Sequence, residues 1–194
     1  MGSYTNISKT LLLIAIFSFS SVSANAEVET YAIDNTHSGI NFKIRHFFTR
    51  IPGNFAEFKG TITVDRDNME NSSTEAVITI ASVDTNNEKR DKHLQSEDFF
   101  LVSDFPSMSF KSSKWETIGE NTYAVTGQLT IKDITKEVVL NITSLGFGKG
   151  SRNSFISGWE GETTIDRTDF GINYGQGVVG NEVEINIYVE AKRL

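Results

Sequence analysis

Few residues of this sequence could carry acid–base or metal chemistry. It contains three histidines, His37, His46 and His93. His37 and His46 flank the first predicted strand, so they lack the i, i+4 spacing at which a helix presents two metal ligands on one face. Only tertiary structure could bring the three imidazoles to one metal ion. We therefore expect these histidines to cap, to form hydrogen bonds or to line a cavity mouth, and we expect no metal site.

The sequence motifs of the common enzyme classes are absent. There is no G-x-S-x-G elbow, HExxH, P-loop or dinucleotide fingerprint. The glycine-rich residues 171–177 lie between predicted strands, which favours a hairpin over a phosphate-binding loop. Asp166, Arg167 and Asp169 are close in sequence, and an Arg between two carboxylates is typical of an ion pair that pins a loop. The sequence therefore predicts that the protein is not an enzyme.

The composition excludes further kinds of site and partner. The chain has no cysteine, which rules out thiol nucleophiles and thiolate metal sites and leaves stability to the core alone. The formal net charge of the 194 residues is −7. A protein this acidic is poorly matched to nucleic acid or to an anionic membrane surface, because both require clustered Lys and Arg.

Residues 1–26 have the features of a signal peptide. Lys9 precedes a short apolar run, residues 11–17, and Ala24-Asn25-Ala26 fits the small-x-small pattern of a cleavage site. The apolar run is far shorter than the roughly 20 residues that span a bilayer, so we expect no membrane-spanning segment. The mature protein is then expected to begin at Glu27 and to work outside the cytoplasm.

Residues 27–194 have the pattern of one domain with about eight strands. Apolar and polar residues alternate along residues 40–45 and most regularly along residues 183–189, as in strands with one wet face. Turn-forming Gly, Asn and Asp residues separate these runs at spacings typical of sandwiches and barrels. The other predicted strands are residues 61–64, 76–83, 108–110, 123–131, 138–145 and 155–165.

One segment lacks the strand pattern and is predicted to be a short amphipathic helix. Residues 87–96 are rich in charged residues and contain no β-branched residue, with Leu94 on the expected buried side. Phe99 and Phe100 follow, and together with the helix they would close one mouth of a barrel. An eight-stranded barrel either just fills its interior with side chains or leaves room for one ligand. Glycines on both sides of Trp159 slightly favour a cavity.

Four blocks of sequence, in order, resemble the YceI-like polyisoprenoid-binding family. The first is Asp34-Asn35-Thr36-His37-Ser38, followed by residues 42–46 and 53–55. The second runs from Ser82 through the predicted helix to Pro106, and the third and fourth are residues 127–136 and 165–172. The resemblance begins at about residue 31 and covers the rest of the chain. One departure is Lys132-Asp133, where the family usually has a glycine.

The resemblance implies an all-β fold, namely an extended eight-stranded antiparallel lipocalin-like barrel with a short helix inserted between strands. It also implies that the barrel binds and carries or stores a long apolar amphiphile, either a polyisoprenoid, an isoprenoid quinone or a fatty-acid derivative. Together with the signal peptide, the resemblance implies a periplasmic location, with secretion to the outside as the alternative. Many family members are dimeric, so a homodimer is a further expectation. The resemblance implies no catalytic residues and no cofactor besides the bound lipid.

The assigned strand registers and the predicted lid give a set of expected ligand-binding residues. His46 is expected to contact the head group, while His93 and the Phe99-Phe100 pair are expected to form the lid. An isoprenoid-processing or metal-dependent enzyme in the same cavity, and a ligand-free structural or interaction barrel, stay open as alternatives. The full expected set is Phe42, Ile44, His46, Ile62, Ile80, His93, Phe99, Phe100, Phe110, Leu129, Leu140 and Trp159.

Overall fold

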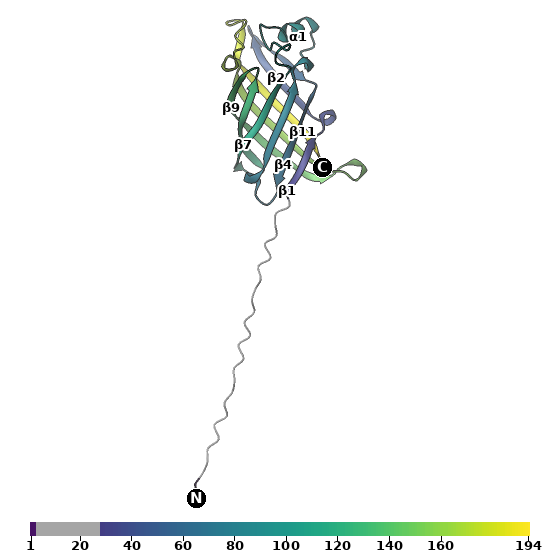
Figure 1. Cartoon of the computed structure of the whole chain (residues 1–194), viewed down its shortest axis with the longest axis vertical. Coiled ribbons are helices and arrows are strands. Elements are labelled where there is room, and N and C mark those ends of the chain that lie inside the picture. Colours follow the sequence, from purple (N-terminus) through teal and green to yellow (C-terminus); the bar gives the residue numbers. More distant parts are fainter. Residues whose placement is uncertain (3–27) are drawn as a thin grey trace.

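A computed structural model describes residues 1–2 and 28–194. The predicted signal peptide, residues 1–26, therefore lies outside the described residues except for its first two. Eight strands close into one antiparallel barrel, which confirms the predicted fold class (Figure 1). In barrel order the strands are β1 (Val28–Ile33), β4 (Phe58–Asp65), β5 (Ser73–Thr79), β7 (Ser107–Gly119), β8 (Thr122–Ile131), β9 (Ile134–Lys149), β10 (Phe155–Asp166) and β11 (Val179–Arg193).

Three further strands extend the wall of the barrel at one end. β2 (Gly39–His46) pairs with the first part of β11, whereas β1 pairs with the last part of it. The short 3-10 helix η1 (Asn35–His37) separates β1 from β2, and the Asp34 side chain caps it by accepting a hydrogen bond from Thr36 N–H. β3 (Thr49–Phe55) pairs with β2, and β6 (Val83–Asp84) pairs with the last two residues of β3.

The only α-helix of the described residues is α1 (Glu88–Leu94), which covers one end of the barrel (Figure 1). The Asn87 side chain caps it by accepting a hydrogen bond from Arg90 N–H. The predicted helix over residues 87–96 is therefore confirmed with slightly shorter bounds. The 3-10 helix η5 (Arg167–Phe170) and the loop of residues 171–178 reach the same end, since Tyr174 stacks on His93 of α1.

The sequence missed β1, β3 and the two-residue β6 as separate strands, and it overextended one strand. β3 was missed because Pro52 and Gly53 weaken its pattern; Pro is tolerated here because only the last two residues of β3 pair with β6. Gly53 is required because a Cβ atom there would lie 2.3 Å from Cζ of Phe42. β1 was missed as well. The predicted strand 76–83 ends at Thr79, where the 3-10 helix η3 (Ile80–Ser82) begins.

An ion-pair network closes the sheet at the end opposite to α1, where β1 and β11 meet. Glu29 accepts hydrogen bonds from Arg193 Nη1 at 2.7 Å and from Tyr31 Oη at 2.5 Å. Burial raises the pKa of Glu29, but these two hydrogen bonds and the positive charges of Arg66 and Arg193 together outweigh burial, so the net pKa is lowered. The Glu29 side chain is only 8% exposed, so this charge depends on its partners inside the protein.

Candidate functional site

A cavity of about 630 Å³ occupies the barrel interior. Its wall follows from strand alternation, because Phe42, Ile44 and His46 of β2 line the cavity while Lys43 and Arg45 between them are exposed. The lining is mostly aliphatic and aromatic. Its polar members include Arg90, His93, Arg167 and Tyr174 near the α1 end, together with His46 at the end of β2.

Eleven of the twelve predicted ligand-binding residues line this cavity, and their contact with a ligand stays a prediction. Ile80 is the exception. Its strand ends one residue earlier, so Ile80 lies in η3, where it is fully buried and its N–H donates to the carbonyl of Pro106. The eleven lining residues are Phe42, Ile44, His46, Ile62, His93, Phe99, Phe100, Phe110, Leu129, Leu140 and Trp159.

β11 contributes lining residues that are not among those expected from the sequence. Val183, Ile185, Ile187 and Val189 all face the cavity. Their strict alternation was visible in the sequence and was used only to predict a strand. The loop residues Ile172 and Val178 also line the cavity, and no local pattern marks them because loop placement depends on tertiary contacts.

Aromatic rings form the floor of the cavity at the end opposite to α1. Trp115 and Trp159 both line the cavity and meet edge to face, with ring centroids 5.9 Å apart. Phe147 packs on Trp159 at 5.5 Å and on Tyr31 at 5.8 Å. Trp159 donates its Nε1–H to Ser157 Oγ at 2.9 Å. Edge-to-face packing of this kind excludes water and makes a rigid floor.

A second aromatic cluster closes part of the mouth. The rings of His93 and Tyr174 lie 4.9 Å apart, and Phe99 lies 5.0 Å from His93 and 5.3 Å from Tyr174. His93 Nε2 is also 2.8 Å from the Asp98 carboxylate. This cluster joins the α1 segment to the loop of residues 171–178 through side chains. His93 and Phe99, two of the predicted lid residues, therefore lie at the cavity mouth.

Two arginines shape the backbone around the mouth. Arg167 is buried and donates to the carbonyls of Gly180 and Ile172 at 2.8 Å each and of Val179 at 3.3 Å. The ion pair expected between Arg167 and the neighbouring carboxylates is not formed, since Asp166 instead accepts from the N–H and Oγ1 of Thr168. Arg167 thus holds the loop by main-chain contacts. Burial lowers its pKa.

Arg90 does the same for the segment before α1. Its Nε donates to Thr85 Oγ1 at 2.6 Å, and its Nη2 donates to the Thr85 carbonyl at 2.7 Å. Thr85 Oγ1 in turn donates to Asp91. Both arginines line the cavity, so the polar side of the mouth is built from groups that also fix its loops.

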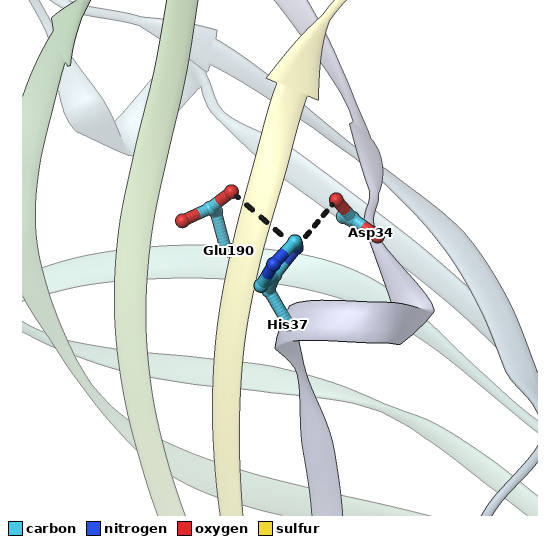
Figure 2. A group of neighbouring side chains, drawn as sticks. All are labelled: Asp34, His37 and Glu190. Carbon is cyan, nitrogen blue, oxygen red and sulfur yellow. Dashed lines mark hydrogen bonds and ion pairs between the residues drawn. The ribbon is translucent and has the colours of Figure 1, made fainter. Parts of the chain in front are cut away.

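The three histidines do not converge on one metal site. His37 lies on the outside of the barrel with Asp34 and Glu190 (Figure 2), and none of these three residues lines the cavity. His37 Nδ1 is 3.0 Å from Asp34 Oδ2 and 3.9 Å from Glu190 Oε1. Lys192 pairs with the same Asp34 oxygen, and this contact holds the Asp34 pKa well below its usual range.

The Asp34–His37–Glu190 group is the only set of three or more potential metal ligands that the described residues bring together. The Lys192 ammonium already pairs with its most buried carboxylate, as expected of a structural ion pair between η1 and β11. The metal-dependent alternative therefore gains no support from the cavity. There His93 lies beside one carboxylate, Asp98, and neither His46 nor His93 belongs to a group of three potential ligands among the described residues.

The family model of the YceI-like domain matches residues 31–191. The chain belongs to the YceI-like family. A UPF0312 protein of Azotobacter vinelandii is 34% identical to this YceI-like chain over 190 residues, which cover 96% of the chain and 99% of the relative. The resemblance on which the sequence analysis relied is thereby confirmed over nearly the full length.

Solved structures share the fold of this YceI-like protein. BcnA of Burkholderia cenocepacia aligns with a TM-score of 0.76 at 24% identity, covering 82% of this chain and 99% of BcnA. A polyisoprenoid binding domain from Saccharophagus degradans aligns with a TM-score of 0.65 at 14% identity, covering 84% of this chain and 98% of that domain. At these identities the likeness shows the shared barrel. Across the described residues, no helix has the length and apolar character needed to cross a membrane.

Proposed function

We propose that this YceI-like protein binds a long apolar amphiphile inside its barrel and carries or stores it in the periplasm. The observation that carries the proposal is the cavity of about 630 Å³, which is apolar along its walls, aromatic at its floor and polar at its mouth. Its volume is in the range of small-molecule sites. Its polarity changes along one axis, as a ligand with a tail and a head group requires.

The energetics favour a long tail. An isoprenoid or acyl chain exposes several hundred Å² of apolar surface in water, and burial at about 25 cal/mol per Å² contributes several kcal/mol before binding costs are subtracted. The walls supplied by β2, β8 and β11 offer apolar contacts along the whole barrel. The tail would then lie against Trp115 and Trp159, while the head group would lie near His46 and His93.

The comparisons support the same ligand class. The YceI-like family is one of binding domains, and the Saccharophagus degradans neighbour is described as polyisoprenoid binding. A polyisoprenoid, an isoprenoid quinone or a fatty-acid derivative fits this proposal. We propose no catalytic role, because the groups that line the cavity are mostly aliphatic or aromatic and its two arginines hold backbone carbonyls.

Export and assembly belong to the same proposal. The signal-peptide pattern of residues 1–26 supports export from the cytoplasm, and membership of the YceI-like family supports a periplasmic location. A homodimer stays a prediction from the resemblance. Amino-terminal sequencing of the protein after expression of the full chain tests the predicted export signal. The expected result is cleavage after Ala26.

The proposal is tested by native mass spectrometry followed by organic extraction and lipid mass analysis. Ala76 of β5 lines the cavity, whereas its neighbour Val77 faces outward and is 39% exposed. Ala76→Trp should therefore fill the cavity and abolish co-purified lipid, while Val77→Trp should retain it at the wild-type ratio. Wild-type protein of bare sequence mass that takes up no added quinone or fatty acid would contradict the proposal.

A further inference from the structure

Two exposed phenylalanines form the tip of the β2–β3 hairpin. Phe47 and Phe48 make the two-residue turn between these strands. The Phe48 side chain is fully exposed and that of Phe47 is 51% exposed. Every other phenylalanine that the structure describes is buried or half-buried. Two consecutive rings left in water at a loop tip are typical of an interaction surface.

The turn presents these rings in a fixed and costly conformation. Phe47 has φ +49°, in the left-handed region that glycine and asparagine normally occupy. Its N–H donates to the Val178 carbonyl at 2.9 Å, and its own carbonyl accepts from Arg45 Nη1 at 2.9 Å. Strain that the surroundings hold in place is characteristic of functional loops. The rings are therefore displayed by a preformed turn.

The hairpin tip lies on the rim of the cavity mouth. His46, the residue before Phe47, lines the cavity and packs edge to face on the Phe47 ring with centroids 4.8 Å apart. Val178, which holds Phe47 by the hydrogen bond above, also lines the cavity. A surface that binds the two rings would therefore face the cavity mouth.

The charge of this hairpin is opposite to that of the whole protein. Residues 35–56 contain Lys43, Arg45 and Arg50 and no Asp or Glu, in a chain whose net charge is −7. Glu184 of β11 pairs with Arg50 at 2.7 Å, and the Arg45 side chain bonds to a main-chain carbonyl. The acidic composition predicted no affinity for an anionic membrane, but this basic segment differs locally from that average.

We propose that the Phe47–Phe48 tip inserts into the head-group region of an anionic lipid bilayer and docks the cavity mouth on it. Aromatic rings at the level of the head groups and flanking Lys and Arg near the phosphates are the combination that binds such surfaces. The inference rests on the proposed function, because a membrane is where a long apolar amphiphile enters or leaves the protein. Docking at the mouth shortens the path of the tail through water.

A flotation assay with vesicles of phosphatidylethanolamine and phosphatidylglycerol tests the docking proposal. The variant is Phe47→Asn with Phe48→Ser, because Asn tolerates positive φ and Phe48 makes no buried contact, so the fold is kept. The control is Ile118→Ser, at an apolar residue that is 58% exposed near the far end of β7. We expect the double variant to bind vesicles roughly tenfold or more weakly than wild type, since two rings lose burial. The control should bind like wild type.

Two results would overturn the docking proposal. One is wild-type protein that does not float with the anionic vesicles, and the other is a double variant that floats equally well. A third result would also contradict it: wild type is a dimer in analytical ultracentrifugation and does not bind vesicles, while the double variant is a monomer. The tip would then be an interface between two copies of the chain.

Uptake of a fluorescent fatty acid from detergent separates this proposal from the proposed function. Equal uptake by wild type and the double variant supports lipid binding in the cavity, independently of the result of the flotation assay. No uptake by wild type contradicts the cavity function, and flotation still reports on docking by itself.

Discussion

The two ends of this barrel are built on different principles. At the floor, Trp115 and Trp159 are each 3% exposed, and the ion pair of Glu29 with Arg193 joins the first and last strands behind them. At the mouth, Tyr174 is 47% exposed and Phe48 is fully exposed. Dense burial makes a region hard to open, and sparse burial makes it the place where local opening occurs. The floor therefore stabilises the fold, and the mouth is the end at which the proposed ligand would enter.

The largest expected effect is at the floor. Trp159→Ala should lower the free energy of unfolding by about 3–5 kcal/mol, because it removes the packing of Trp159 against Trp115 and Phe147 and leaves a cavity. Urea denaturation followed by circular dichroism measures the change. A loss below about 1 kcal/mol would show that the floor is not the stabilising end.

The next effect depends on pH and on the ion pair behind the floor. The pKa of Glu29 is lowered in the folded state, so its contribution to stability is present above the unfolded pKa and is lost as the pH falls through the folded pKa. Glu29→Gln should cost about 2 kcal/mol at neutral pH and less at about pH 3, which lies below the unfolded pKa. Urea midpoints at the two pH values measure this difference.

The control for Glu29 is Glu184→Gln. Glu184 forms an exposed pair with Arg50, with the two side chains 41% and 65% exposed. Exposed pairs of this kind contribute little, so the change should stay within about 0.5 kcal/mol at both pH values. An equal loss in both variants would contradict the role given to burial.

A change at the mouth should have a small effect on the free energy of unfolding and a larger effect on the rate of ligand release. Tyr174→Ala removes the ring that stacks on His93 and Phe99, yet it should cost less than about 1 kcal/mol because Tyr174 is half-exposed. Release of a bound fluorescent fatty acid should become several times faster by stopped-flow measurement. Unchanged release would show that this cluster does not restrict the mouth.

The sequence predicted the strands and the helix better than it predicted their junctions. Strict alternation identified β2 and β11, and charge density identified α1, because both signals depend on local side-chain order. The break at Thr79 was invisible, since Ile80 continues the apolar pattern while its backbone turns into η3. Consequently Ile80 was placed on the cavity wall, and the structure buries it elsewhere.

The candidate site was partly predictable for the same reason. Inward positions of strands follow from periodicity, as with Phe42 and Leu129, whereas Ile172 and Val178 line the cavity only because Arg167 fixes their loop through three carbonyls. The exposed turn at Phe47 was likewise not predicted. Its positive φ is an unusual conformation for phenylalanine, and no sequence rule anticipates it.

The smallest expected effect concerns the β8–β9 turn. Lys132 has φ +57°, in the left-handed region that glycine normally occupies. Lys132→Gly should relieve the left-handed strain and raise the free energy of unfolding by about 0.5 kcal/mol, with no effect on the mouth or the floor. Urea denaturation measures the gain, and a loss of stability would contradict the strain argument.

In the proposed complex, the ligand lies along the barrel axis with its tail on the floor and its head group at the mouth. The chain has two tryptophans, Trp115 and Trp159, and both belong to the floor. Quenching of their fluorescence by fatty acids brominated either near the methyl end or beside the carboxylate measures the orientation directly. We expect strong quenching by bromine near the methyl end and weak quenching by bromine beside the carboxylate. Absence of quenching by both, or the opposite order, would contradict it.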